Sequence, residues 1–299
     1  MCTVIIEANT RTNLIFSLSI MRGKINFIKI KKIILILGQV NNAKPDIFDI
    51  IKFLKNKKII VIETDRENFQ KYTTDKIHSI YTFSFVPLQL LKFKILNLLN
   101  ANIIRHEEGV GNYLSLLGVC RELYKINFYF LAFRTPVARL LKLILDLLSF
   151  TKDEYLIDKK NKVNLRLKNL IIKTLEDIHK KKIKKKYDAI FCINQISEYR
   201  KLKKVIESYK SVIVKPHPRF YNYFKKKKFY EKKFFYKGSL TSEELVFIYK
   251  IHTIWGFNSS TLIYCKILFN IKSINIPLPE IKFSTRIKKI FNKFTLIKK

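Results

Sequence analysis

Short apolar runs that alternate with helix-like segments most constrain what this chain can fold into. Thr3–Ile6, Ile33–Leu37, Lys58–Ile62 and Ile80–Phe85 are rich in Ile, Val and aromatic residues, as buried strands are. Between two of them, Ile47–Lys55 has the apolar spacing of a helix. Strands that alternate with helices predict a mostly parallel, doubly wound sheet, and therefore an α/β fold.

The same alternation returns after a lysine-rich run at 180–186. Asp188–Ile193, Val212–Val214 and Thr253–Trp255 are strand candidates, and Ser197–Tyr209 has helical spacing. Two weaker strand candidates complete the set, at Phe234–Tyr236 and Ile271–Ile276. A chain of 299 residues is long enough for two such units, each with its own core.

We therefore expect a Rossmann-like domain at 1–160, a second at 161–280 and a basic amphipathic tail at 281–299. In the tail, apolar residues recur at helical spacing: Ile287, Ile290, Phe291 and Phe294. Two alternatives remain open for this helix. It lies on an anionic membrane surface, or it packs back on the body of the protein.

Charge separates the possible partners only in part. The chain has 59 Lys and Arg against 23 Asp and Glu, a net charge of +36. Such a field attracts polyanions, among them nucleic acids, acidic lipids and acidic glycans. A basic nucleic-acid-binding protein is the non-enzyme alternative, but no zinc-finger, RRM, KH or helix-turn-helix pattern is present. We therefore expect no specific nucleic-acid partner.

The sequence also bears on location. No secretory signal pattern opens the chain, and the charge-free run Ile77–Leu91 is shorter than the span of about 20 residues that a bilayer requires. The four cysteines form no CxxC pair, which is typical of free thiols in a reducing compartment. We expect a cytoplasmic protein that is soluble or lies peripherally on a membrane surface.

Three small motifs follow strand candidates, where α/β folds place their ligands. The first is Glu107-Glu108-Gly109, which follows a strand candidate at Asn102–Arg105 and the residue His106. Paired carboxylates at a strand end suit general-base chemistry, because one raises the pKa of the other towards neutrality. A polar turn without catalytic function is the alternative.

The second motif is Lys215-Pro216-His217-Pro218-Arg219. Each proline fixes its own φ and restricts the residue before it, so the histidine lies in a stiff loop. His217 flanked by two cations suits a phosphate, which it can protonate or hydrogen-bond. A surface turn with an incidental histidine is the alternative.

The third motif, Asn258-Ser259-Ser260-Thr261, stands where a helix is expected to begin. Hydroxyls and free N–H groups at a helix N-terminus form an anion site, although an ordinary N-cap uses the same residues. Upstream, Thr241 and Glu244 have the spacing of a capping box at the start of another helix. No His, Cys and Asp cluster has metal-ligand spacing, so we expect no metal.

The order Glu-Glu-Gly, His-Pro, Ser-Ser resembles the three-motif signature of bacterial sialyltransferases, a group that includes lipooligosaccharide sialyltransferases and capsular polysialyltransferases. The resemblance implies a GT-B fold, with two Rossmann-like lobes facing each other across a cleft. It also implies a CMP-sialic acid donor and no required metal or other cofactor. The chain is short for the polysialyltransferases, which favours the transfer of single residues.

The resemblance assigns roles to residues of this chain. Glu107 would deprotonate the acceptor hydroxyl, and His217 would stabilise or protonate the departing CMP phosphate. Ser259 and Ser260 would bind that phosphate, and Glu244 would hold the ribose hydroxyls or only cap its helix. Glu108 and Gly109 would support the base. The complete set expected to bind the sugar donor is Lys215, Pro218, Arg219, Glu244, Asn258, Ser259 and Ser260.

The expected function is therefore an inverting transfer of sialic acid from CMP-Neu5Ac onto a bacterial surface glycan, lipooligosaccharide or capsule. Partners would be the CMP-sialic acid donor, a glycan or glycolipid acceptor and anionic lipid of the inner leaflet. A Kdo-type transferase that uses CMP-Kdo is the alternative within enzymes.

Overall fold

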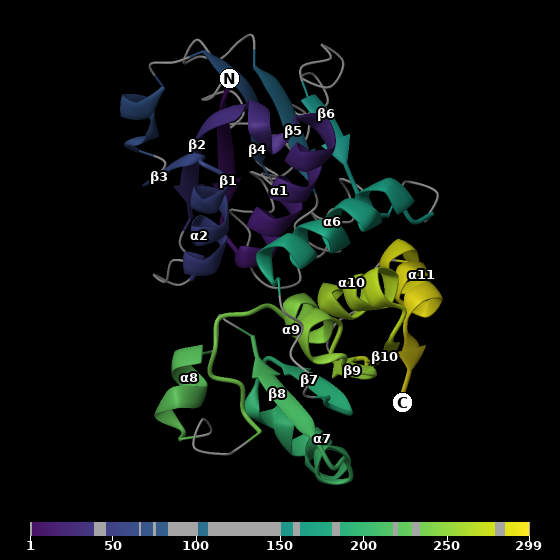
Figure 1. The fold of residues 1–299 in the computed structure, drawn as a ribbon. Coiled ribbons are helices and arrows are strands. Elements are labelled where there is room, and N and C mark those ends of the chain that lie inside the picture. The colour runs from purple at the N-terminus through teal and green to yellow at the C-terminus, as the bar shows by residue number, and fades with distance from the viewer. Residues whose placement is uncertain are drawn as a thin grey trace, which may run out of the picture. The chain divides into compact units, whose positions relative to one another are not determined.

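The computed structural model describes residues 2–38, 46–65, 67–73, 76–82, 101–106, 151–157, 162–180, 186–217, 221–228, 234–278 and 285–298. The chain divides into two compact units, Met1–Ile178 and His179–Lys299. Each unit contains one parallel β-sheet with helices (Figure 1). The prediction of two Rossmann-like α/β domains is confirmed.

The first unit contains a six-stranded sheet in which every neighbouring pair is parallel. The strands are β1 (Cys2–Ala8), β2 (Ile30–Leu37), β3 (Ile60–Thr64), β4 (Ile77–Thr82), β5 (Asn102–His106) and β6 (Thr151–Glu154). Their order, β3-β2-β1-β4-β5-β6, is that of dinucleotide-binding Rossmann sheets. The winding direction reverses between β1 and β4.

Burial on both faces explains why the central strands are continuous apolar runs. In β2 the four residues from Ile33 to Ile36 are all 0% exposed, and β1 is buried from Thr3 to Ala8. A strand that is covered on both sides has no polar face, so it shows no alternation. This is the physical reason why the strand predictions in this unit succeed.

The helices of the first unit are α1 (Arg11–Lys24), η1 (Phe27–Lys29), α2 (Phe48–Asn56), η2 (Phe69–Tyr72) and α6 (Leu165–Ile178). Helix α1 was not predicted. The Thr10 side chain accepts a hydrogen bond from the Asn13 N–H, and the Asn13 side chain accepts one from the Thr10 N–H, which makes a capping box. Every residue from Asn13 to Met21 is buried, so no polar stripe marks the helical period.

Helix α6, which we expected in the second domain, packs against α1 in the first unit. The Arg166 guanidinium donates to the Gly23 carbonyl at 2.9 Å. At the other end of α6, Arg22 forms an ion pair with Asp177 at 2.8 Å. These contacts make α6 part of the layer that covers the first sheet.

The second unit contains a five-stranded sheet, also parallel throughout, in the order β11-β10-β9-β7-β8. Its strands are β7 (Ala189–Ile193), β8 (Val212–Pro216), β9 (Thr253–Gly256), β10 (Lys272–Asn275) and β11 (Leu296–Ile297). The chain runs from β7 to β8 on one side and then returns to β9 on the other side of β7. The winding direction therefore reverses between β7 and β9, which is where open α/β sheets bind ligands.

The helices of the second unit are α7 (Ile196–Glu207), α8 (Tyr221–Lys226), α9 (Ser242–Tyr249), α10 (Ser260–Phe269) and α11 (Thr285–Phe294). Aromatic rings fill its core. Phe191 of β7 stacks on Trp255 of β9 with ring centroids 5.8 Å apart, and Phe224 and Phe235 are buried in the same cluster. The strand predicted at Phe234–Tyr236 is reduced to one bridge between Phe235 and Val214.

The C-terminal tail belongs to this unit. Ile287, Ile290 and Phe291 of α11 are at most 2% exposed, and α11 packs on α10. Strand β11 then pairs with β10 at the edge of the sheet. Of the two alternatives for the tail, packing on the body is the one observed, so this apolar face is not available to a membrane.

Among the described residues, no helix combines the length and the apolar character needed to cross a bilayer. Cys2, Cys192 and Cys265 are free thiols. Cys265 is fully buried on α10, and burial raises the pKa of its thiol well above the ordinary value. Cys265 is therefore a small apolar residue of the core.

Candidate functional site

The carboxyl edge of the second sheet brings two of the predicted motifs together. Because β7, β8 and β9 are parallel, the segments that follow them leave the sheet at the same edge. The segment after β8 contains His217, and the segment after β9 contains Ser259. Strand β7 lies between β8 and β9 in the sheet, so the two motifs flank its carboxyl end.

His217 directly follows β8. Its backbone N–H donates to the Ile193 carbonyl at 2.8 Å, which ties the start of this loop to the end of β7. The His217 side chain is exposed, whereas Pro216 is buried. The Lys215 ammonium lies 5.2 Å from the centroid of the Tyr236 ring, in cation–π geometry. Pro218 and Arg219, the rest of the motif, lie outside the described residues.

The segment after β9 begins α10, as predicted. Ser259 is the N-cap of α10 and Ser260 is the first helical residue. The Ser259 side chain makes no capping hydrogen bond. The first-turn N–H groups of α10 therefore lack their usual side-chain acceptor, and they carry the positive end of the helix dipole. Such a terminus is suited to bind an anion.

Asn258 supports this turn in an unusual backbone conformation. Its φ is 49°, in the left-handed region that non-glycine residues adopt at a cost, least for Asn. The Asn258 N–H donates to Asn275 Oδ1 at 2.7 Å, and Asn275 Nδ2 donates back to Asn258 Oδ1 at 3.2 Å. Asn275 is the last residue of β10 and is 2% exposed. The sequence did not single out Asn275.

Glu243, also not singled out, contacts the same turn from α9. The Thr261 hydroxyl donates to Glu243 Oε1 in a short hydrogen bond. Glu243 is 6% exposed, and burial raises the pKa of its carboxyl. Next to it, Ser242 Oγ and Cys192 Sγ lie 3.3 Å apart. The buried Glu243 carboxyl group thus contacts the first turn of α10, next to Ser259 and Ser260.

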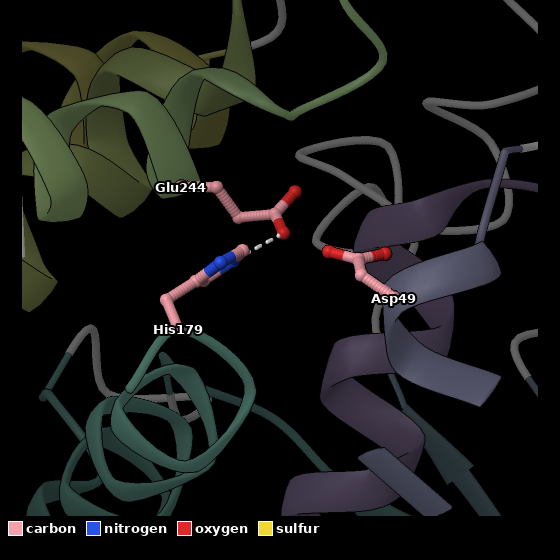
Figure 2. Close-up of side chains that lie close together, drawn as sticks. All are labelled: Asp49, His179 and Glu244. Atoms are coloured by element: carbon pink, nitrogen blue, oxygen red, sulfur yellow. Dashed lines mark hydrogen bonds and ion pairs between the residues drawn. The ribbon is translucent and has the colours of Figure 1, made fainter. Parts of the chain in front are cut away.

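Glu244 acts as a cap in the structure. It is 0% exposed, and it forms the capping box of α9 with Thr241, whose N–H donates to Glu244 Oε2 at 2.8 Å. Its other oxygen lies 2.8 Å from His179 Nε2, the bond drawn as a dashed line in Figure 2. Both carboxylate oxygens therefore have partners within the second unit. A role in binding the ribose would require the carboxylate to exchange one of them.

The segment after β7 is held by another buried carboxyl group. Glu198 of α7 accepts from the Asn194 N–H at 2.6 Å and from its side-chain amide at 3.2 Å. Glu198 is 3% exposed, and burial raises the pKa of its carboxyl. The segment that follows β7, between the two motifs, is therefore held in place by Glu198.

In the first unit, the acidic motif Glu107-Glu108-Gly109 lies outside the described residues. Strand β5 ends at His106, directly before it, which agrees with the predicted strand. His106 is 1% exposed, its Nε2 lies 2.8 Å from Ser17 Oγ, and its ring stacks on Phe16. The side chain of His106, at the end of β5, is therefore held by Ser17 and Phe16.

Three comparisons place the chain among known proteins. A family model described as alpha-2,8-polysialyltransferase matches residues 2–276. No curated protein matches the chain.

Several solved structures are similar to the chain at low identity. The sialyltransferase GT-B domain from Photobacterium damselae is 12% identical, with a TM-score of 0.47 over 100% of this chain and 98% of that one. The E. coli heptosyltransferase WaaC is 11% identical, with a TM-score of 0.43 over 98% and 97%. The wall teichoic acid polymerase TagF is 11% identical, with a TM-score of 0.46 over 93% and 70%.

The family match runs from β1 to the residue after β10, so it covers the first sheet, β7 to β10 of the second sheet and both motifs of the second unit. It agrees with the resemblance that the Glu-Glu-Gly, His-Pro and Ser-Ser motifs carry. The chain belongs to the alpha-2,8-polysialyltransferase family and is a glycosyltransferase of the sialyltransferase kind.

Proposed function

We propose that this enzyme transfers sialic acid from CMP-Neu5Ac to a glycan with inversion, and that the carboxyl edge of the second sheet binds the donor's phosphate. The observation that carries the proposal is the position of two motifs at this edge. His217 follows β8 on one side of β7, and the uncapped Ser259-Ser260 turn follows β9 on the other side. Cation, imidazole and helix N-terminus are each suited to a phosphate group.

Sialyl transfer from a CMP-activated donor requires only a few functions from the carboxyl edge of the second sheet. CMP is already a good leaving group, so the protein must hold the sugar donor and neutralise the charge that develops on the phosphate. In the proposal His217 donates a hydrogen bond or a proton to that phosphate, and Ser259 and Ser260 bind its oxygens. Lys215 and Arg219 add positive charge. Pro218 and Asn258 shape the two segments.

The proposed base is Glu107, with Glu108 and Gly109 in support. Glu107 would remove the proton of the acceptor hydroxyl as that oxygen attacks the anomeric carbon. Attack from the face opposite CMP inverts the configuration. No step in this scheme requires a metal, so we propose that the reaction proceeds without one.

Two classes of acceptor glycan are compatible with the proposed function. The family's description names an alpha-2,8 linkage and a polymer, which implies an acceptor that ends in sialic acid. The other class is a galactose-terminated lipooligosaccharide or capsule glycan. Both classes therefore belong in the assay.

We also propose that the enzyme associates with anionic lipid at the inner face of the bacterial inner membrane. Because the apolar face of α11 is buried, this association would be electrostatic. Lys288, Lys289 and Lys293 lie exposed on the outer side of α11. Co-sedimentation with phosphatidylglycerol vesicles at low salt, lost at about 0.5 M salt, is the expected result. Binding that persists at high salt would contradict it.

The test of the donor is direct. Purified protein is offered CMP-Neu5Ac or CMP-Kdo at equal concentration, each with galactose-terminated and sialic acid-terminated acceptors, and CMP release is followed. We expect release from CMP-Neu5Ac only, lost in His217→Ala. Release from CMP-Kdo alone would replace the proposal by a Kdo-type transferase.

A further inference from the structure

The turn at the start of α10 is held from two directions by side chains that reach it from other elements. Asn275 reaches Asn258 from the end of β10, and Glu243 reaches Thr261 from α9. Asn275 and Glu243 stand outside the three motifs, whereas Thr261 is the last residue of the third. Between the two points of attachment lie Ser259 and Ser260.

Asn275 forms two hydrogen bonds with Asn258. One side-chain amide satisfies both the N–H and the side-chain oxygen of Asn258, and Asn275 is buried. Because Asn258 has a left-handed backbone, the turn has an intrinsic preference to relax to another conformation. The amide pair opposes this relaxation. It therefore determines the direction in which the next residues leave β9.

The contact with Glu243 fixes the other side of the turn. Thr261 is the second residue of α10, so its hydroxyl bond to Glu243 holds the first helical turn against α9. Glu243 is buried, and its Oε1 accepts the hydrogen bond from Thr261. A contact with the phosphate itself is therefore not required to explain its position.

We propose that Asn275 and Glu243 are positioning residues that hold Asn258–Thr261 in its phosphate-binding conformation before the sugar donor arrives. This inference rests on the proposed function of the Ser259-Ser260 turn. Such preorganisation acts on the fraction of molecules that are competent to bind, and the apparent dissociation constant rises as that fraction falls. Once the donor is bound, the chemical step is unchanged.

The expected signature is a change in the donor KM with little change in kcat. Two neutral hydrogen bonds of ordinary net strength correspond to about a tenfold change in an equilibrium constant. Asn275→Ala should therefore raise the KM for CMP-Neu5Ac about tenfold, with kcat within about threefold of wild type. The Kd for CMP, measured by calorimetry, should rise by the same factor.

Asn270→Ala is the matched control. Asn270 also has a left-handed backbone, with φ 53°, and it ends the same helix at the opposite terminus. It pairs with Lys266, away from the turn. This substitution should lower the stability of α10 without changing the KM or the Kd for CMP.

The second arm uses conservative variants, so that a failure to fold does not end the test. Glu243→Gln retains an oxygen that can accept from Thr261, and should keep a donor KM near wild type, whereas Glu243→Ala should raise it. Thr261→Ser keeps the hydroxyl and Thr261→Val removes it at similar volume. A simple loss of packing would make the Ser variant the worse of the two, and positioning predicts the reverse.

The outcomes separate the two proposals. If wild type releases CMP and Ser259→Ala raises the donor KM, but Asn275→Ala and Thr261→Val leave KM and the Kd for CMP unchanged, the positioning role is wrong and the phosphate site stands. If wild type neither releases nor binds CMP, the phosphate site is wrong, and the positioning role is wrong with it.

Discussion

The packing of the C-terminal helix makes a quantitative prediction through Ile290. This side chain is 0% exposed on the face of α11 that contacts α10. Ile290→Ala removes three carbon groups, each worth about 0.8 kcal/mol when buried. The cavity left behind adds to the loss, and core substitutions of this kind cost about 2–5 kcal/mol. We expect the free energy of unfolding of the second unit to fall by about 3 kcal/mol.

A single tryptophan makes this measurable in one unit alone. Trp255 is the only Trp in the chain, lies in β9, and is 4% exposed. Its Nε1 donates to Tyr209 Oη at 3.1 Å, and the Lys298 ammonium lies 4.9 Å from its ring centroid. Urea unfolding followed by Trp255 fluorescence therefore reports the stability of the second unit.

The control is Lys289→Ala, an exposed residue that directly precedes Ile290 on the same helix. It should change the free energy of unfolding by less than about 0.5 kcal/mol. If Ile290→Ala were as mild as Lys289→Ala, the helix would not be packed on the body. The alternative, a tail whose apolar face lies on a membrane, would then be restored.

Four further predictions follow from the two units. His217→Ala should raise the donor KM and lower kcat together, because the proposal has the imidazole contact the phosphate in both the ground state and the transition state; a change in neither, in steady-state kinetics, would remove it from the site. Burial raises the pKa of Glu243, so its contribution to stability is present below the ordinary value of 4.5 and is lost as the pH rises through the folded-state pKa. Urea titrations at several pH values should show wild type losing stability relative to Glu243→Gln as the pH rises, and a pH-independent difference would refute this. Thr241→Ala breaks the capping box of α9 and should cost about 1 kcal/mol in the same assay, against a few tenths for an exposed threonine. Excess EDTA should leave the rate of CMP release unchanged, and a loss that added divalent cations restore would contradict the metal-free scheme.

Much of the fold was predictable because the signal is local. A parallel strand buried on both faces is an unbroken apolar run, as Ile33–Leu37 shows. The start of α10 was predictable for a similar reason, since Ser259 is chemically suited to a helix N-terminus. Helix α1 was missed because it is buried on all sides and therefore shows no amphipathic period.

The positioning residues of the candidate site were not predictable, because their contacts depend on how elements pair. Asn275 is an ordinary residue at a strand end, and only the parallel register of β9 and β10 brings it to Asn258. Glu243 reaches Thr261 because α9 packs on α10. The capping-box spacing with Thr241 predicts a role for Glu244, the residue after Glu243. In the structure Glu244 caps α9.

The tail illustrates the same limit. The spacing of Ile287, Ile290 and Phe291 predicts an amphipathic helix, and α11 is that helix. The spacing contains no information about which apolar surface covers the helix. The presence of α10 and the pairing of β11 with β10 decide it.

Sialyl transfer in the proposed scheme depends on the acidic motif, and an assay of CMP release with a Glu107 variant tests this dependence. Purified protein is incubated with CMP-Neu5Ac, without an acceptor and with galactose-terminated or sialic acid-terminated acceptors, and CMP release is followed. Glu107→Gln is run in parallel, and its binding of CMP is measured by calorimetry. We expect CMP release that requires an acceptor and disappears in Glu107→Gln. The affinity of this variant for CMP should be nearly that of wild type. Full activity in Glu107→Gln would exclude it as the base, and no release from wild type with any acceptor would contradict the account.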